Sequence, residues 1–118
     1  MLNLNHKKLD TWKLGIEFVI DIYQMTEGFP KSEIYGLTNQ LRRAAVSIPS
    51  NIAEGASRKS SIERKRFYEI ARSSLVEIDT QLEIAIKLKY CTKETISPFS
   101  EKMNHLFALI TQLIKKTN

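Results

Sequence analysis

Apolar residues recur at steps of three and four along most of the chain, and this spacing restricts the fold more than any other feature. One helix face carries Leu37, Leu41, Ala44, Ala45, Ile48 and Ile52. A later face carries Phe67, Ala71, Leu75, Ile78, Leu82 and Ala85. Only four glycines and three prolines occur in 118 residues, and no alternation of period two indicates a strand. The sequence therefore predicts an all-α domain.

Two further segments show the same periodicity. The first helix, which should end before Gly28 and Pro30, is assigned a core face of Trp12, Ile16, Val19, Ile20 and Tyr23. It also has a surplus apolar stripe that one core should not need, formed by Leu14, Phe18, Ile22 and Met25. The last helix is expected to begin at Ser97-Pro98, with Phe99, Met103, Leu106, Ile110 and Leu113 facing inward. Between them, Ser60 and Glu63 match a capping box that opens the third helix.

Four helices joined by short connections predict an antiparallel up-down-up-down four-helix bundle. We expect a single domain over residues 1–118, with a flexible N-terminus at residues 1–9. The predicted core comprises Trp12, Ile16, Leu41, Ile48, Phe67, Leu75, Ile78, Leu82, Leu106 and Ile110.

Pro49 lies inside the second helix, and the apolar register continues through it without a shift. We therefore interpret this segment as one helix kinked at the proline. Because proline cannot donate to the carbonyl of Ala45 and its ring crowds that turn, the alternative is two helices broken near Ile48.

The chain is expected to be cytoplasmic. Cys91 is the only cysteine, so no intramolecular disulfide is possible, and a single thiol suits a reducing compartment. The stretch "MLNLNHKKLD" lacks the apolar run of a signal peptide, and charges interrupt every apolar stretch, so no membrane association is expected.

Several stretches resemble a known family. "FP" at Phe29-Pro30, "YGLTNQLRRAAVSIPSNIAEGASR" and "FYEIARSSLVEIDTQLEIA" are similar to the four-helix-bundle proteins encoded in bacterial 23S rRNA intervening sequences. The resemblance extends from Leu9 to about Tyr90, and the final helix matches only in its general pattern. It implies a ring-shaped homo-oligomer, with a pentamer favoured, and no established enzymatic activity. It also implies relatives among the accessory variability proteins of diversity-generating retroelements, which work with a reverse transcriptase and its RNA.

Charge is concentrated in one segment. Residues Leu41 to Arg72 contain all six arginines and the whole net charge of +5, whereas the remainder of the chain is balanced. Clustered arginine suits contact with phosphate oxygens, and a one-sided basic patch is typical of nucleic-acid binders. The candidate RNA-binding residues are Arg58, Lys59, Arg64, Lys65, Arg66 and Arg72, with Tyr68 available to stack on bases. Ordinary salt bridges on a solvated helix are the alternative reading.

The second helix carries small residues on the side opposite its core face, which indicates close approach of another subunit. The candidate oligomer interface comprises Arg42, Arg43, Ser47, Ser50 and Glu54. We expect Arg43 to meet a carboxylate on the neighbouring copy, with Glu54 a candidate. A ring requires two different patches to meet, and the surplus stripe of the first helix is the candidate second half.

No catalytic motif is found. His6 and His105 have no ligand-spaced partners, and glycines do not flank Ser47 or Ser50 as in a nucleophile elbow. We therefore expect no enzyme, no metal and no cofactor. Two functions remain: an RNA-binding accessory module, or a structural adaptor whose basic segment meets an acidic protein partner.

Overall fold

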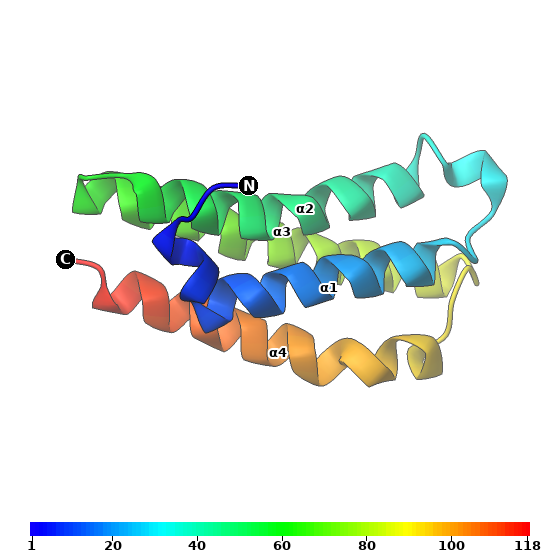
Figure 1. Cartoon of the computed structure of the whole chain (residues 1–118). Helices are drawn as coiled ribbons and strands as arrows, with labels where there is room; N and C mark the ends of the chain where they lie inside the picture. Colours follow the sequence, from blue (N-terminus) through cyan, green and yellow to red (C-terminus); the bar gives the residue numbers. More distant parts are fainter.

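The computed structural model describes all 118 residues and contains only helices and their connections. The elements are η1 (Asn5–Lys8), α1 (Asp10–Thr26), η2 (Lys31–Glu33), α2 (Leu37–Ser57), α3 (Ser61–Lys87) and α4 (Lys93–Lys116), where η marks a 3-10 turn. Figure 1 shows the four α-helices side by side, with the chain reversing direction at each connection. The C-terminus and the segment just before α1 lie toward the end of the bundle that carries the α2–α3 connection, whereas the N-terminal residues run back along α2. The predicted all-α four-helix bundle is confirmed.

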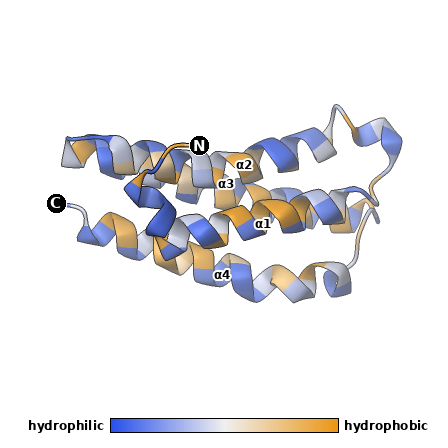
Figure 2. Cartoon of the chain, viewed as in Figure 1, coloured by the Kyte–Doolittle hydropathy of each residue, from blue (hydrophilic) through white to orange (hydrophobic).

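The core runs along the centre of the bundle and receives side chains from all four helices. Its largest fully buried side chains are Phe18, Ile22, Leu41, Ile48, Ile52, Ile78, Leu106 and Ile110. Figure 2 shows bands of hydrophobic and hydrophilic residues along each helix, as expected of helices that bury one face. The core faces predicted for α2 and for most of α3 and α4 are confirmed.

The core face predicted for α1 is wrong at Ile16, Ile20 and Tyr23, which are exposed, whereas Trp12 and Val19 pack partly buried against the core. The surplus stripe supplies the buried residues Phe18 and Ile22, whereas Ile16 is 39% exposed and Trp12 is half-buried. The buried face also contains Gly15, which lies against the side chains of Ile48 and Pro49 on α2. This face packs inward although the other apolar stripe contains equally large residues.

Pro49 lies within a continuous α2, so the alternative of two helices broken near Ile48 is wrong. Its ring is buried, and an ideal Cβ on Gly15 would lie 3.5 Å from the Pro49 Cβ. The Pro49 ring thus faces Gly15 of α1 and leaves room for a Cβ there. A kink at this position stays a prediction.

The predicted start of α4 at Ser97-Pro98 is also wrong. Thr92 is the N-cap, and Thr92 and Thr95 form a capping box in which each side chain pairs with the other residue's backbone N–H. Pro98 therefore lies inside the helix, one and a half turns from its start, where it removes a single backbone bond. At mid-bundle, Lys102 of α4 forms an ion pair with Asp21 of α1 at 2.8 Å.

Candidate nucleic-acid interface

The α2–α3 connection, residues 58–60, is held by polar contacts of its own. Ser60 is the N-cap of α3, and its Oγ accepts the N–H of Glu63 at 3.3 Å, which is one of the two bonds of the predicted capping box; the Glu63 side chain does not accept the Ser60 N–H. Arg64 donates from Nη1 to the carbonyl oxygens of Arg58 (3.1 Å) and Lys59 (2.7 Å). Arg64 therefore fixes the loop, and fewer of its five donors remain for a phosphate.

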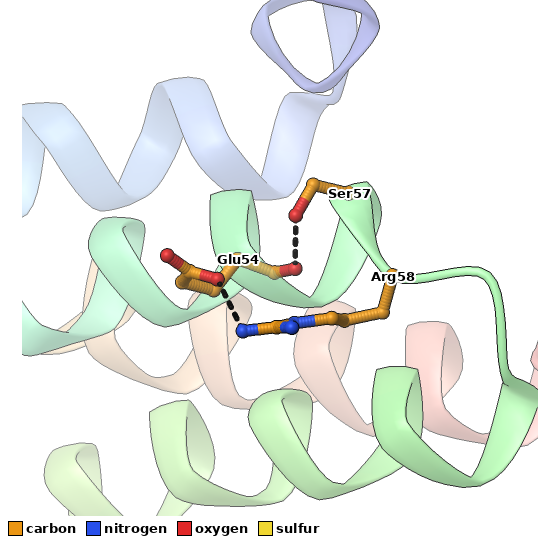
Figure 3. Close-up of polar contacts among 3 residues, drawn as sticks. All are labelled: Glu54, Ser57 and Arg58. Carbon is orange, nitrogen blue, oxygen red and sulfur yellow. Dashed lines mark hydrogen bonds and ion pairs between the residues drawn. The ribbon is translucent and has the colours of Figure 1, made fainter.

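Arg58 is held at the outer edge between α2 and α3. Its Nη2 donates to Glu54 Oε2 at 3.1 Å, and its guanidinium lies over the ring of Phe67 at 4.9 Å. Figure 3 shows this pair together with Ser57, whose Oγ donates to the Glu54 carbonyl at 2.7 Å. The Arg58 side chain is still 43% exposed, so its remaining donors face solvent.

The other predicted binding residues divide into two groups. Lys59 and Arg66 are exposed and Lys65 is half-buried, all at or near the loop. Arg72 lies two turns beyond Lys65 and faces α4, where its Nη1 donates to Thr111 Oγ1 at 3.2 Å and its guanidinium lies 5.9 Å from the Phe107 ring centre. The structure therefore brings the loop residues together and leaves Arg72 apart from them.

Four lysines that the sequence analysis missed lie toward the same end. η1 carries Lys7 and Lys8, and the last turn of α4 carries Lys115 and Lys116. A hollow of about 380 Å³ shows that these elements meet, since it is lined by His6, Ala56, Tyr68 and Leu113 among others. The signal was available in the sequence, because in an up-down-up-down bundle the second connection shares an end with both termini.

We call this surface the basic end. It comprises Lys7, Lys8, Arg58, Lys59, Arg64, Lys65, Arg66, Lys115 and Lys116. The carboxylates within or next to these segments are Asp10, Glu54 and Glu63, and Glu54 is already paired with Arg58. Cations from three separate parts of the chain therefore lie toward one end of the bundle and outnumber the carboxylates there.

The aromatic residues of this region have the opposite exposure from that predicted. Tyr68 is 3% exposed and packs against Gly55, whereas Phe67, which was assigned to the core, is half-buried beneath Arg58. Burial raises the pKa of the Tyr68 hydroxyl, and the nearby charge of Arg64 opposes that rise. Tyr68 is therefore unable to stack on a base.

The predicted oligomer-interface residues are not all on the surface. Arg42 donates to Thr26 Oγ1 at 2.9 Å and to the Tyr23 carbonyl at 3.3 Å, and its guanidinium lies over the Tyr23 ring at 4.6 Å. Ser47 forms a 2.9 Å hydrogen bond with Ser74 of α3, so it joins these two helices. Both side chains hold the monomer together.

Arg43, Ser50 and Glu54 are exposed along the outside of α2. The surplus stripe of α1 is buried in the core, so its predicted place in the oligomer interface is wrong. The α1 stripe that does reach the surface contains Ile16, Ile20 and Tyr23, which are 39%, 51% and 39% exposed. Tyr23 lines a hollow of about 560 Å³ with Arg43 and Val46 of α2. We call Ile16, Ile20, Tyr23, Arg43, Val46 and Ser50 the outer α1–α2 face.

No group of three or more His, Cys, Asp or Glu side chains lies close enough to hold a metal ion. None of the helices combines the length and apolar character needed to cross a membrane.

Comparisons with known proteins identify the family. The family model of the 23S rRNA-intervening sequence protein matches residues 7–112. A search of curated proteins gave no match. Among solved structures, a protein of unknown function of the S23 ribosomal protein family from Bacteroides thetaiotaomicron has the same fold, with a TM-score of 0.78 and 22% identity over 90% of this chain and 99% of that chain. The chain belongs to the 23S rRNA-intervening sequence protein family.

Proposed function

We propose that this chain is a non-enzymatic, oligomeric accessory protein that binds RNA through its basic end. The observation that carries the proposal is the gathering of nine cationic side chains from three parts of the chain against three carboxylates. Six of these cations, Lys8, Arg58, Lys59, Arg66, Lys115 and Lys116, are exposed. Exposed cations that are not matched by carboxylates suit a polyanion whose counterions they replace.

The proposed contacts are with the phosphate backbone. Tyr68 is buried and Phe67 lies beneath Arg58, so the basic end offers no open aromatic platform for bases. Phosphate contacts position a protein without reading sequence. Recognition should therefore depend on the shape and charge of the RNA rather than on its sequence.

Self-association would strengthen such binding. The outer α1–α2 face combines three exposed apolar side chains of α1 with small and apolar residues of α2. We propose that it packs against a different patch of the next copy in a closed ring, with a pentamer favoured. Arg43 would meet a carboxylate there, although Glu54 is less available because it pairs with Arg58 in the same chain. A ring repeats the basic end on every subunit, so weak contacts combine.

The experiment is binding of a fluorescently labelled structured RNA at increasing salt. If each subunit neutralises about three phosphates, log affinity against log salt should have a slope steeper than about −2. The variant Lys59→Glu/Arg66→Glu changes two exposed cations of the basic end and spares Arg64, which holds the loop. It should weaken binding strongly.

The matched control is Lys31→Glu/Lys87→Glu, which makes the same charge change at exposed positions on η2 and at the end of α3, at the opposite end of the bundle. Equal weakening by both double variants would mean that net charge alone attracts RNA, and the basic end would not be the site. Absence of RNA binding even at low salt would favour the adaptor function, in which this end meets an acidic protein, such as a reverse transcriptase partner.

A further inference from the structure

The side of the bundle formed by α3 and α4 carries a long groove of about 600 Å³. Its floor is apolar and belongs to the core, with Leu75, Leu82 and Ile96 buried beneath it. On α4 it extends from Lys93 to Phe107, a distance of about 21 Å at the usual helical rise. The groove is therefore long enough for about four turns of a third helix.

Two large apolar side chains of this groove are left open to solvent. Val76 of α3 is 54% exposed, and Phe107 of α4 is 41% exposed. They flank the groove at the end nearer Arg72, and Met103 and Ile86 line it further along as half-buried residues. Exposed apolar walls above an apolar floor are typical of a surface that takes a hydrophobic partner.

The charge of the groove differs from that of the rest of the protein. Between Arg72 and Lys87, α3 carries three carboxylates, Glu77, Asp79 and Glu83, and no cation. Asp79 and Glu83 line the groove, and neither forms an ion pair. The facing wall on α4 is neutral, formed by Ser97, Ser100 and Asn104, with Lys93 at one end. Arg72 lies beside Phe107 at one end of the groove and Lys93 at the other, so the unpaired Asp79 and Glu83 mark a stretch of local negative potential between these two cations.

We propose that this groove binds one amphipathic helix of a partner protein, whose apolar ridge fills the groove and whose lysines or arginines meet Asp79 and Glu83. The ridge requires apolar residues at steps of three and four, which place them on one helix face. The flanking cations supply complementarity to the α3 wall, and an acidic helix is repelled there. RNA is excluded from the groove by the same carboxylates. The proposal does not depend on RNA binding at the basic end.

The probe is a labelled helical peptide of about 14 residues with leucines at steps of three and four and lysines elsewhere, matched in length to the groove. The control peptide has the same sequence with every lysine replaced by glutamate. Fluorescence anisotropy should show that the lysine peptide binds and the glutamate peptide does not. This order is the reverse of what the net charge of +5 would produce through non-specific attraction.

Two pairs of variants locate the binding. Val76→Arg places a cation in the groove, and Ile84→Arg makes the same change at a position on α3 that is 44% exposed but does not line it. The first should weaken lysine-peptide binding by about tenfold, whereas the second should leave it unchanged. Asp79→Asn/Glu83→Gln should likewise weaken binding, and Glu69→Gln, an exposed change outside the groove, should not.

All variants are compared by circular dichroism, so that loss of fold is not mistaken for loss of binding. The assay is repeated with the variant Lys59→Glu/Arg66→Glu, which alters the basic end and not the groove. This variant should still bind the lysine peptide. The proposal is overturned if the glutamate peptide binds as well, if Val76→Arg and Ile84→Arg act alike, or if no lysine-peptide binding occurs up to about 1 mM, the weak end of measurable affinities.

Discussion

Gly55 near the end of α2 lies directly against the ring of Tyr68 on α3. A Cβ built on Gly55 would stand 2.7 Å from Tyr68 Cε1 and 3.1 Å from the carbonyl oxygen of Arg64. The first distance is shorter than van der Waals contact permits, and the second is tight against a backbone atom, which yields little. The glycine thus lets α2 and α3 approach at the basic end, where the loop between them presents its cations.

Gly55→Ala should therefore destabilise the protein by about 1–3 kcal/mol through overpacking. The matched control is Gly15→Ala, whose Cβ would lie at an ordinary 3.5 Å from Pro49 Cβ. Because alanine favours helix over glycine, the control should be neutral or stabilising by up to about 1 kcal/mol. Urea unfolding of both variants checks this. Equal stabilities would show that Tyr68 moves aside freely.

Glu33 of η2 joins the start of α2 to the α3–α4 connection at the other end of the bundle. Its Oε1 accepts the N–H of Leu37, the first residue of α2, at 2.9 Å, and its Oε2 accepts the hydroxyl of Tyr90 at 2.7 Å. The Leu37 N–H, followed by the Tyr90 hydroxyl, lowers the pKa of the Glu33 carboxyl below its usual value. Both contacts favour the ionised form, which also suits a helix N-terminus.

A lowered pKa of a carboxyl in the folded state stabilises the protein above the pKa of the unfolded chain, and this contribution is lost as pH falls through the folded pKa. Glu33→Gln should therefore reduce stability near neutral pH and make little difference in acid below the folded pKa of Glu33. Urea unfolding of both proteins across this range checks the sign. A stability difference that stays constant with pH would contradict the role of the charge.

The number of helices and the core faces of α2, α3 and α4 could be predicted from the sequence, because each of these three helices has one continuous apolar face. The core face of α1 was predicted incorrectly, because α1 has two apolar faces. Which stripe packs inward depends on the partner helix, and the inward stripe lies on the side of Gly15, which faces Pro49 of α2. The packing of α1 against α2 is a tertiary contact, and the helical periodicity of α1 alone does not predict it.

Ile78 of α3 and Ile16 of α1 allow the correct and the incorrect core prediction to be compared by measurement. Both were predicted to be core residues, but Ile78 is fully buried and Ile16 is 39% exposed. Ile78→Ala should cost about 2–5 kcal/mol through lost burial and a cavity, whereas Ile16→Ala should cost under about 1 kcal/mol in a monomer. Denaturant unfolding of dilute protein separates the two. Comparable losses would mean that the faces of α1 are assigned incorrectly.

The candidate site was predicted only in part. A local excess of arginine is visible in the sequence, and it pointed to the α2–α3 connection. The engagement of Arg64 by loop carbonyls and of Arg72 by Thr111 depends on how side chains meet in space. Lys115 and Lys116, by contrast, follow from the order of the helices, because α4 ends where α3 begins.

The last prediction concerns assembly through the outer α1–α2 face. Ile20 is 51% exposed and Ser50 is exposed, so changing either leaves the core intact. Light scattering should give wild-type protein a mass several times 13.6 kDa, with five copies favoured. Ile20→Arg should reduce the mass toward one chain by placing an unpaired charge in the interface, and Ser50→Trp should do so by overpacking.

Ile84→Arg provides the control for this assembly experiment, because Ile84 is similarly exposed but lies on α3, away from the outer α1–α2 face. Its mass should remain that of the wild type. If Ile84→Arg dissociates the particle and Ile20→Arg does not, the interface lies on α3 instead. A wild-type mass of one chain at high micromolar concentration would contradict the proposed self-association. Each basic end would then have to bind RNA without the gain from multivalency.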